Sequence, residues 1–281
     1  MKIDWKKVDP LIEWSIEEDI GTGDITTEAV LVEHIQARGE VLAKDNLVLA
    51  GIDIIPHILS KVTHDFEFEP YFHDGDHVPA GNVIAAITTE ARVLLTHERV
   101  ILNYLQRLSG IATNASKFAS LVEGTKAKIA DTRKTTPGWR VLEKYAVKVG
   151  GGENHRFGLF DAVLIKDNHI KLVGGIGEAV RRMRGFIPHY LKLEVEASTP
   201  EQVREALEAG VEIIMLDNMD DTILEEMVKL INGRAVIEVS GGVNLGNVKR
   251  IAELGVDLIS IGAITHSAPA MDISMNINAL G

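Results

Sequence analysis

The chain has 281 residues, of which 46% are hydrophobic and 25% are charged, a composition typical of a globular enzyme rather than of a disordered or fibrous protein. It contains no cysteine, which excludes disulfides, thiolate metal sites and cysteine nucleophiles. The formal net charge of −12 argues against a nucleic-acid partner. No secretory signal is visible, and the longest charge-free apolar stretch near the end, residues 258–271, is shorter than the roughly 20 residues of a membrane span. We therefore expect a cytoplasmic protein without a membrane partner.

The first hundred residues alternate between helical and extended patterns. Hydrophobic periodicity predicts helices over residues 10–20 and 52–59. Alternating stretches predict strands over residues 35–42, 62–68 and 83–93. We therefore predict an N-terminal α+β sandwich domain, residues 1–109, joined by the C-terminal segment 268–281. A long apolar-striped helix over residues 92–122 is expected to connect the two domains.

The segment His73-Asp74-Gly75-Asp76-His77 offers four potential metal ligands within five residues. It precedes Val78-Pro79 and a predicted strand, however, and Asp and Gly favour turns through local hydrogen bonding and φ freedom. We predict a tight turn here rather than a metal site.

From about residue 110 onward, six short apolar runs alternate with helical patterns. The runs cover residues 127–130, 162–165, 191–195, 212–216, 235–239 and 257–261. Helix caps are expected from a hydroxyl of Ser198-Thr199 before Pro200, at Asp221-Thr222 and at Asn244. Strands buried on both faces and separated by helices imply a parallel sheet with right-handed crossovers. The predicted fold class is α/β, an incomplete β/α barrel of about six parallel strands over residues 110–267.

Polar side chains follow these runs at the point where each strand is expected to end. In β/α barrels the carboxyl ends of the strands meet at one rim, which carries the active site. The middle of the chain is also basic, since residues 91–171 contain 14 Lys and Arg against 7 Asp and Glu, whereas the remainder contains 15 against 34. We therefore predict a positively charged site for a compact polyanion.

The residue types at this rim suggest specific roles. Arg133, Lys134, Arg156, Lys166 and His155 could surround a ligand with several negative charges, because guanidinium groups grip carboxylates and phosphates bidentately. Glu196 and Asp217 could hold ribose hydroxyls, bind Mg²⁺ through water, or stabilise positive charge at a sugar carbon. Solvated basic side chains, a satisfied core histidine at His155 and a glycosidase-like acid pair are the simpler alternatives. Glycine loops at Ser240-Gly241-Gly242 and at Gly262 favour a phosphate, although a tight turn explains the first equally well.

Ordered motifs along almost the whole chain resemble the quinolinate phosphoribosyltransferase family. They are Glu18–Thr26, Glu98–Asn103, Arg107–Thr113, Asp131–Gly138, Asn154–Arg156, Ile165–His169, Glu194–Glu196, Leu216–Asn218, Ser240–Gly242 and Gly262–Ser267. The resemblance implies transfer of phosphoribose from phosphoribosyl pyrophosphate to the ring nitrogen of quinolinate, with loss of CO₂. It also implies Mg²⁺, no organic cofactor, and an obligate homodimer with shared sites that could assemble further.

The resemblance also assigns roles to single residues. It places Arg133, His155, Arg156 and Lys166 on the quinolinate carboxylates, with Thr132 beside them, and Lys134 nearer the sugar phosphate. Glu196 and Asp217 face the ribose and its metal, and with Lys134 and Lys166 they form the expected catalytic set. Arg99 is expected to reach into the partner's site. The phosphate is expected to lie among Ser240, Gly241, Gly242, Gly262 and His266.

Two alternatives remain open beside this reading. The first is a paralogue with the same fold and another substrate, such as the molybdate-transport-associated relatives, and the retained cationic set Arg133, His155, Arg156 and Lys166 argues against it. The second is a barrel that only binds a phosphorylated ligand without catalysis, and the retained Glu196 and Asp217 argue against that.

Overall fold

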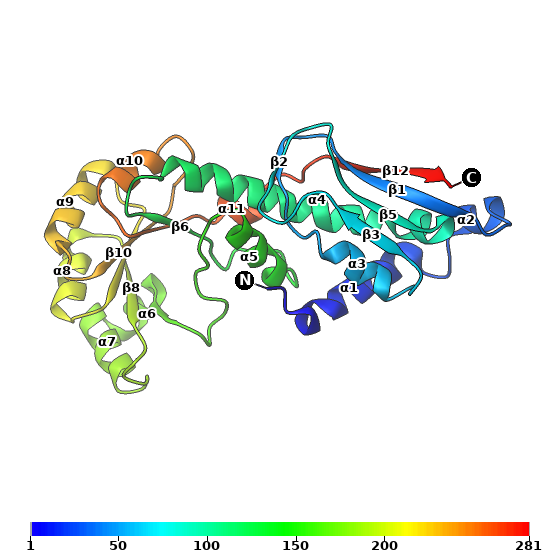
Figure 1. Cartoon of the computed structure of the whole chain (residues 1–281). Helices are drawn as coiled ribbons and strands as arrows, with labels where there is room; N and C mark the ends of the chain where they lie inside the picture. Colours follow the sequence, from blue (N-terminus) through cyan, green and yellow to red (C-terminus); the bar gives the residue numbers. More distant parts are fainter. Residues whose placement is uncertain (1, 281) are drawn as a thin grey trace. The chain divides into compact units, whose positions relative to one another are not determined.

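The computed structural model describes residues 2–280, which form two compact units (Figure 1). Within the described residues, the first unit comprises residues 2–116, 135–151 and 264–280, and the second comprises Lys117–Lys134 and Gly152–Ala263. Residues 135–151 therefore belong to the first unit by their contacts, although they fall within the range predicted for the barrel.

The first unit is built on a four-stranded antiparallel sheet. Its order is β12 (Ile273–Ala279), β1 (Gln36–Ala43), β5 (Val83–Glu90) and β3 (Glu67–Pro70). In β1 every second residue is buried, the pattern of a strand with one face toward a core. The C-terminal strand β12 lies antiparallel to β1, so the two ends of the chain contribute to one sheet. A separate pair joins β2 (Leu47–Val48) to β4 (His77–Val78).

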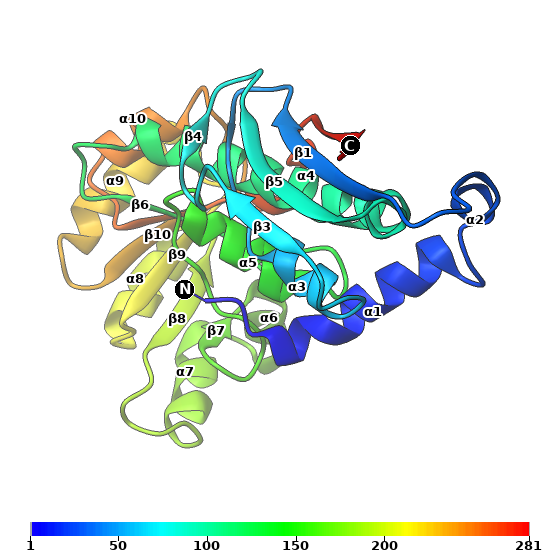
Figure 2. The same cartoon turned by 45° about the vertical axis from the view of Figure 1, so that its right-hand side comes forward.

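Helices pack beside this sheet. The unit contains α1 (Trp5–Ile20), α2 (Ile25–Val30), α3 (Ile54–Ser60), α5 (Arg140–Val149) and most of α4 (Ala91–Leu121) and α11 (Ala263–His266). Helix α4 runs along the sheet in both views (Figures 1 and 2). Leu94 of α4 approaches Gly39 of β1 so closely that a Cβ there would lie 3.3 Å from the leucine side chain. A glycine at this position lets the helix and the strand pack tightly.

The segment His73–His77 forms the predicted turn. Asp76 accepts a hydrogen bond from the backbone N–H of His73 (2.7 Å), and Asp74 accepts one from Ile52 N–H (2.9 Å). Gly75 has a φ of 96°, which only glycine adopts readily. Both carboxylates thus accept hydrogen bonds from backbone N–H groups, and the predicted turn is confirmed.

The second unit contains six parallel strands in the order β6-β11-β10-β9-β8-β7. They are β6 (Lys128–Ala130), β7 (Val163–Ile165), β8 (Leu193–Ala197), β9 (Ile213–Asp217), β10 (Val236–Ser240) and β11 (Leu258–Ser260). Each predicted apolar run overlaps one of them. Within residues 2–280, β6 and β7 do not pair with each other, so the sheet is unclosed. The predicted incomplete β/α barrel is therefore confirmed.

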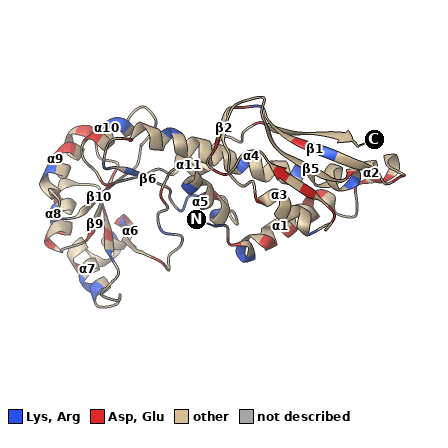
Figure 3. Cartoon of the chain, viewed as in Figure 1, with Lys and Arg blue, Asp and Glu red and all other residues tan. Residues whose placement is uncertain are grey.

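Helices α6 (Asp167–Val173), α7 (Ile176–Arg184), α8 (Pro200–Glu208), α9 (Asp221–Ile231) and α10 (Val248–Glu253) follow the strands. Helices α7 to α10 lie along one face of the sheet and carry both acidic and basic residues (Figures 2 and 3). In the described part of the chain, no helix combines the length and apolarity of a membrane span.

Two of the three predicted caps need revision. Thr199 caps α8 as predicted, accepting a hydrogen bond from Gln202 N–H (3.3 Å). The cap of α9 is Asp220, one residue earlier than predicted. The prediction for Asn244 is wrong, because α10 begins at Val248 and Asn244 instead accepts a hydrogen bond from Gly246 N–H within the preceding turn.

Candidate active site

Strand register places the chemically active side chains on one face of the six-stranded sheet. Residues paired in parallel strands point to the same side. Glu196 of β8, Met215 of β9 and Glu238 of β10 are in register. Asp217 of β9 and Ser240 of β10 are also paired, two residues nearer the carboxyl ends and therefore on the same face. We call this side the site face, and the carboxyl ends of the strands the rim.

The opposite side of the sheet is apolar and faces the helices. Its residues include Val195, Ile214, Ile237 and Ile259, each at most 3% exposed. Helix α8 packs directly against β8 and β9. Burying one such aliphatic side chain stabilises the fold by about 1.5–3 kcal/mol, so this side anchors the strands on which the site is built.

Lys166 and Glu196 form an ion pair on the site face, with 2.7 Å between Nζ and Oε2. Glu196 is buried whereas Lys166 is half-exposed, so the pair lies at the rim with its ammonium toward solvent. Lys166 also precedes α6, and its backbone N–H donates to Nδ1 of His169 (3.0 Å). Two residues predicted from the sequence are thus brought together, an acid and a base that can each contact a bound ligand.

Asp217 ends β9 beside the glycine loop that follows β10. The side-chain amide of Asn218 donates to the Asp217 carboxylate (3.0 Å). Gly241 has a φ of 87°, and a Cβ there would collide with the Asn218 amide. Glycine is therefore required on two counts, conformation and close approach.

The glycine loop also borders a cavity of about 280 Å³ at the ends of β9 and β10. Ser240, Gly241 and Gly242 line one side of it. Asn244 and Asn247 hold the loop by donating to the Gly242 carbonyl (3.2 and 3.1 Å). Leu216, Leu224 and Val239 also line the cavity, so it lies toward the helix side of the rim, and Asp217 does not line it.

The segment Asn154–Arg156 is fixed against the end of β6. Asp131 is completely buried and accepts hydrogen bonds from the backbone N–H of His155 (2.8 Å) and from the side chain of Asn154 (2.7 Å). A backbone bridge between Ala130 and Glu153 extends this pairing. Because Thr132 and Arg133 directly follow Asp131, the two basic segments of the predicted site are held side by side.

His155 lies between two buried carboxylates of the site face. Its Nε2 is 3.4 Å from Glu194 Oε2 and 3.4 Å from Glu238 Oε1. Burial disfavours the charged ring, but hydrogen bonding and attraction to the two carboxylates outweigh it and raise the pKa of His155 to about 10. Burial, together with the charge of Glu238, raises the pKa of Glu194. Within residues 2–280, this is the one group of three side chains spaced to hold a metal ion.

Arg133 and Arg156 lie close enough to influence each other. Burial lowers the pKa of Arg156, and the charge of Arg133 lowers it further. Arg156 also donates from Nη1 to the carbonyl of Ala162 (3.5 Å). Guanidinium groups at a partly buried rim are suited to bind an anion.

The structure places the remaining predicted residues as follows. The backbone N–H of Lys134 donates to the hydroxyl of Thr132 (3.0 Å), so both belong to the loop after β6. Gly262 follows β11 at the same rim. Arg99 and His266 belong to the first unit, where Arg99 is 3.9 Å from Glu98 and His266 Nδ1 is 2.7 Å from the Ser267 hydroxyl. Their predicted roles stay predictions.

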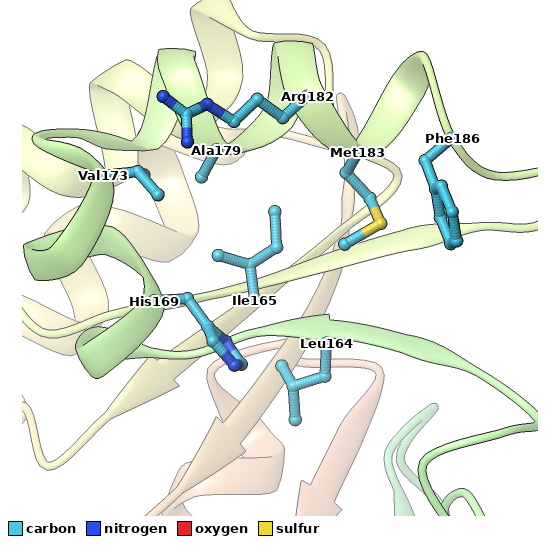
Figure 4. Close-up of a pocket in the computed structure, with 8 residues that line it drawn as sticks. All are labelled: Leu164, Ile165, His169, Val173, Ala179, Arg182, Met183 and Phe186. Atoms are coloured by element: carbon cyan, nitrogen blue, oxygen red, sulfur yellow. The ribbon is translucent and has the colours of Figure 1, made fainter.

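A second cavity of about 430 Å³ lies beside the edge strand β7, between α6 and α7 (Figure 4). Its lining is mostly apolar, and His169 and Arg182 are its two polar residues. It contains none of the predicted site residues, so the rim remains the candidate active site.

Sequence reasoning missed Glu238 and assigned Glu194 only to the end of its strand. Glu194 is the second residue of β8 and only 4% exposed, and Glu238 is the third residue of β10 and 1% exposed. A carboxylate flanked by Ile237 and Val239 was the available signal, because burying a charge requires a partner.

The fold and this rim define an enzyme of the β/α-barrel class that handles a compact ligand with several negative charges. Residues 111–276 match the family described as quinolinate phosphoribosyl transferase, C-terminal domain, and residues 24–109 match its N-terminal domain. The chain therefore belongs to the quinolinate phosphoribosyltransferase family.

Individual relatives agree with this assignment. The chain is 44% identical over 260 residues to the probable nicotinate-nucleotide pyrophosphorylase (carboxylating) of Bacillus subtilis, covering 92% of this chain and 90% of the relative. It is 40% identical over 287 residues to quinolinate phosphoribosyltransferase (decarboxylating) 2, mitochondrial, of Nicotiana glauca, covering 95% and 81%. The crystal structure of NadC from Streptococcus pyogenes superimposes with a TM-score of 0.94 at 39% identity, covering 99% and 100%. Nicotinate-nucleotide pyrophosphorylase from Ehrlichia chaffeensis gives a TM-score of 0.94 at 41% identity, with the same coverage.

Proposed function

We propose that this chain transfers phosphoribose from phosphoribosyl pyrophosphate to the ring nitrogen of quinolinate, giving nicotinate mononucleotide, pyrophosphate and CO₂ in NAD biosynthesis. The relatives' names describe this reaction from its two directions, one as carboxylating and the other as decarboxylating. The structural observation that carries the proposal is the gathering of basic residues at one rim. Lys166 is paired with Glu196 at 2.7 Å, and the buried Asp131 holds the segment that carries Arg156 beside the segment that carries Arg133.

Different residues of the rim bind the two substrates. Arg133, Arg156 and Lys166, with His155 and Thr132 beside them, bind the quinolinate carboxylates, and Lys134 extends toward the phosphoribosyl donor. Ser240, Gly241, Gly242, Gly262 and His266 receive a phosphate, as the family resemblance implies. The protein thereby orients two polyanions that would otherwise repel each other.

The chemistry follows from this arrangement. The pyridine nitrogen attacks the anomeric carbon while pyrophosphate leaves, and the sugar acquires oxocarbenium character that Glu196 and Asp217 stabilise. Alkylation makes the ring nitrogen cationic, so the ring can accept the electron pair of the carbon–carboxylate bond as CO₂ departs. A proton then takes the place of the carboxylate. Lys166, held by Glu196 at 2.7 Å, connects the carboxylate-binding set to the ribose-facing acids.

Magnesium fits the donor set at the rim. Glu196 and Asp217 are carboxylates on adjacent strands of the site face, and Mg²⁺ prefers such oxygen ligands together with waters and substrate phosphates. We expect these two residues to hold the ion, in part through water and only with the phosphoribosyl donor. The bound ion would neutralise charge on the departing pyrophosphate.

The direct test is quinolinate-dependent release of pyrophosphate and CO₂ by the purified enzyme with phosphoribosyl pyrophosphate and Mg²⁺. Both products should appear in equal amounts, and omission of either substrate should abolish both. Absence of turnover with all components present would contradict the proposal and favour a non-catalytic barrel. Turnover with a different acceptor but not with quinolinate would favour the paralogue with another substrate.

We further propose a homodimer in which Arg99 of each subunit reaches the site of the other. Arg99 lies on α4 and its side chain is 56% exposed, so it is accessible to a neighbouring subunit. Mixing Arg99→Ala subunits with Lys166→Ala subunits should restore part of the activity, because one site of each mixed dimer is intact. Mixtures that stay inactive despite demonstrated subunit exchange would contradict sharing. The cytoplasmic location and any assembly beyond a dimer stay predictions.

A further inference from the structure

The buried cluster of His155, Glu194 and Glu238 is not explained by contact with a substrate. The His155 side chain is 13% exposed, and those of Glu194 and Glu238 are 6% and 1% exposed. Two carboxylates at this depth are costly to bury, since each loses its hydration. Substrate binding alone therefore does not account for the burial of these two carboxylates, whereas their contacts with His155 do.

The imidazole is engaged by the protein through both ring nitrogens. Nε2 faces Glu194 and Glu238 at 3.4 Å each, so this nitrogen carries a proton whether the ring is neutral or charged. Nδ1 is 2.7 Å from the backbone nitrogen of Arg156, whose N–H donates to it. The carboxylates favour a second proton on the ring, whereas this N–H opposes one, because a protonated Nδ1 cannot accept. Both contacts are satisfied when Nε2 carries a proton.

The two carboxylates have few other attachments. Within residues 2–280, Oε1 of Glu194 and Oε1 of Glu238 are both buried without a hydrogen-bond partner. Glu238 therefore faces the imidazole at 3.4 Å as a charge, and the imidazole and the nearby Arg156 charge are the groups that compensate Glu194. Glu194 and Glu238 come from β8 and β10, two strands separated by β9. His155 thus ties its own segment to two strands of the barrel.

The same segment is fixed at a third point. Asp131, at the end of β6, accepts the backbone N–H of His155 at 2.8 Å. The charged groups that face the imidazole are therefore Glu194 from β8 and Glu238 from β10, with Asp131 at its backbone and Arg156 next in the chain. A backbone held this firmly leaves Arg156 little freedom except in its side chain.

We propose that Glu194 and Glu238 are positioning residues, which fix the imidazole of His155 by its Nε2–H so that Arg156 is presented to quinolinate. The proposal rests on the proposed function above and modifies it in one respect. His155 acts on the substrate through Arg156 rather than through its own Nε2. The site needs this support because His155 and Arg156 share one backbone segment, so a displaced imidazole would also displace the residue that carries the guanidinium.

The first experiment compares the kinetics of Glu238→Gln and Glu194→Gln with those of the wild type. Both variants should raise KM for quinolinate on the order of tenfold while leaving KM for phosphoribosyl pyrophosphate near the wild-type value. Glu212→Gln is the control, because this carboxylate accepts Leu193 N–H (2.8 Å) at the amino end of β8 and does not face the imidazole. Unchanged KM for quinolinate in both site variants, or an equal rise in the control, would overturn the proposal.

The second experiment observes the ring directly by ¹⁵N NMR of histidine-labelled protein. His155→Gln identifies the His155 signals among those of the 10 histidines. Nε2 should stay protonated across neutral pH in the wild type, and the ring pKa should fall in Glu238→Gln. An unprotonated Nε2 in the wild type, or signals unaffected by Glu238→Gln, would contradict the proposal even if the enzyme turned out to have no quinolinate activity.

Loss of folding must be separated from loss of positioning. Glu238→Asp keeps the charge and shortens the side chain, so it should restore part of the quinolinate affinity lost in Glu238→Gln. Circular dichroism should show all variants folded. A folded Glu238→Asp that performs no better than Glu238→Gln would argue that the carboxylate has only a packing role.

Discussion

A buried ion pair in the first unit gives a quantitative prediction about stability. Glu143 is completely buried and accepts hydrogen bonds from Arg107 (2.8 Å from Nη2 and 3.3 Å from Nε). It also accepts from the Thr136 hydroxyl (2.8 Å) and the Thr136 backbone N–H (3.2 Å). Glu143→Leu removes all of these bonds and leaves the Arg107 guanidinium, only 24% exposed, with two backbone carbonyls as its remaining partners.

Breaking such a pair by removing one partner typically costs about 3–5 kcal/mol. We expect the lower end, about 3 kcal/mol, because Arg107 retains the carbonyls of Thr265 and Ala268 and some solvent. For a chain of this size that corresponds to a fall in Tm of roughly 6–12 °C. Arg107→Met should cost more than Glu143→Leu, because it leaves a carboxylate with no exposure at all. Urea unfolding followed by circular dichroism, together with calorimetry, measures both variants.

The double variant Arg107→Met/Glu143→Leu separates the two contributions. It removes both charges and fills the space with apolar side chains, so its free energy of unfolding should exceed that of either single variant. A Glu143→Leu variant that loses less than about 1 kcal/mol would show that the pair behaves like an exposed one. A double variant no more stable than Arg107→Met would refute the claim that the uncompensated charge causes the loss.

Three further predictions concern backbone geometry and the sheet edge. Gly110→Ala should destabilise the protein strongly, since its Cβ would collide with the Pro269 carbonyl. Gly177→Ala in α7 should be neutral or stabilise the protein by about 0.5–1 kcal/mol. Thermal unfolding of both variants measures the difference. Gly241→Ala should displace the Asn218 amide from Asp217 and raise KM for phosphoribosyl pyrophosphate while leaving quinolinate binding, measured by calorimetry, intact. Deletion of residues 273–281 should expose the edge of β1 and cause aggregation, visible by light scattering, and retention of a monodisperse protein would contradict this.

The strands of the barrel could be predicted because their signal is local. Runs such as Ile213–Leu216 combine β-branched and aliphatic residues with a polar residue at the carboxyl end, and that pattern requires a strand buried on both faces. Even the ends of the elements agree to within one or two residues in most cases. The cap of α10 was mispredicted for a physical reason, since Asn244 forms a local turn as readily as a helix cap.

The partners of His155 could not be predicted, because they depend on register and on distance in the folded chain. Glu194 and Glu238 lie far from His155 in the sequence, and each is surrounded by residues that satisfy a strand pattern. Only the parallel pairing through Ile213 and Met215 puts both carboxylates on the same side of the sheet. Contacts of residues 135–151 with the first unit were unpredictable for the same reason, since the fully buried position of Glu143 depends on Arg107.

Charge placement in the second unit explains how an acidic protein builds a site for two polyanions. The cations Arg133, Arg156 and Lys166 lie at or beside the rim, where a ligand can reach them. Glu194 and Glu238 are buried more deeply on the site face, where their carboxylates face the imidazole of His155. Because coulombic interactions weaken with distance and with solvent, a ligand at the rim is attracted mainly by the nearest cations. The net charge of −12 therefore says little about the ligand, whereas the local placement of Arg133, Arg156 and Lys166 supports the anion site proposed at the rim.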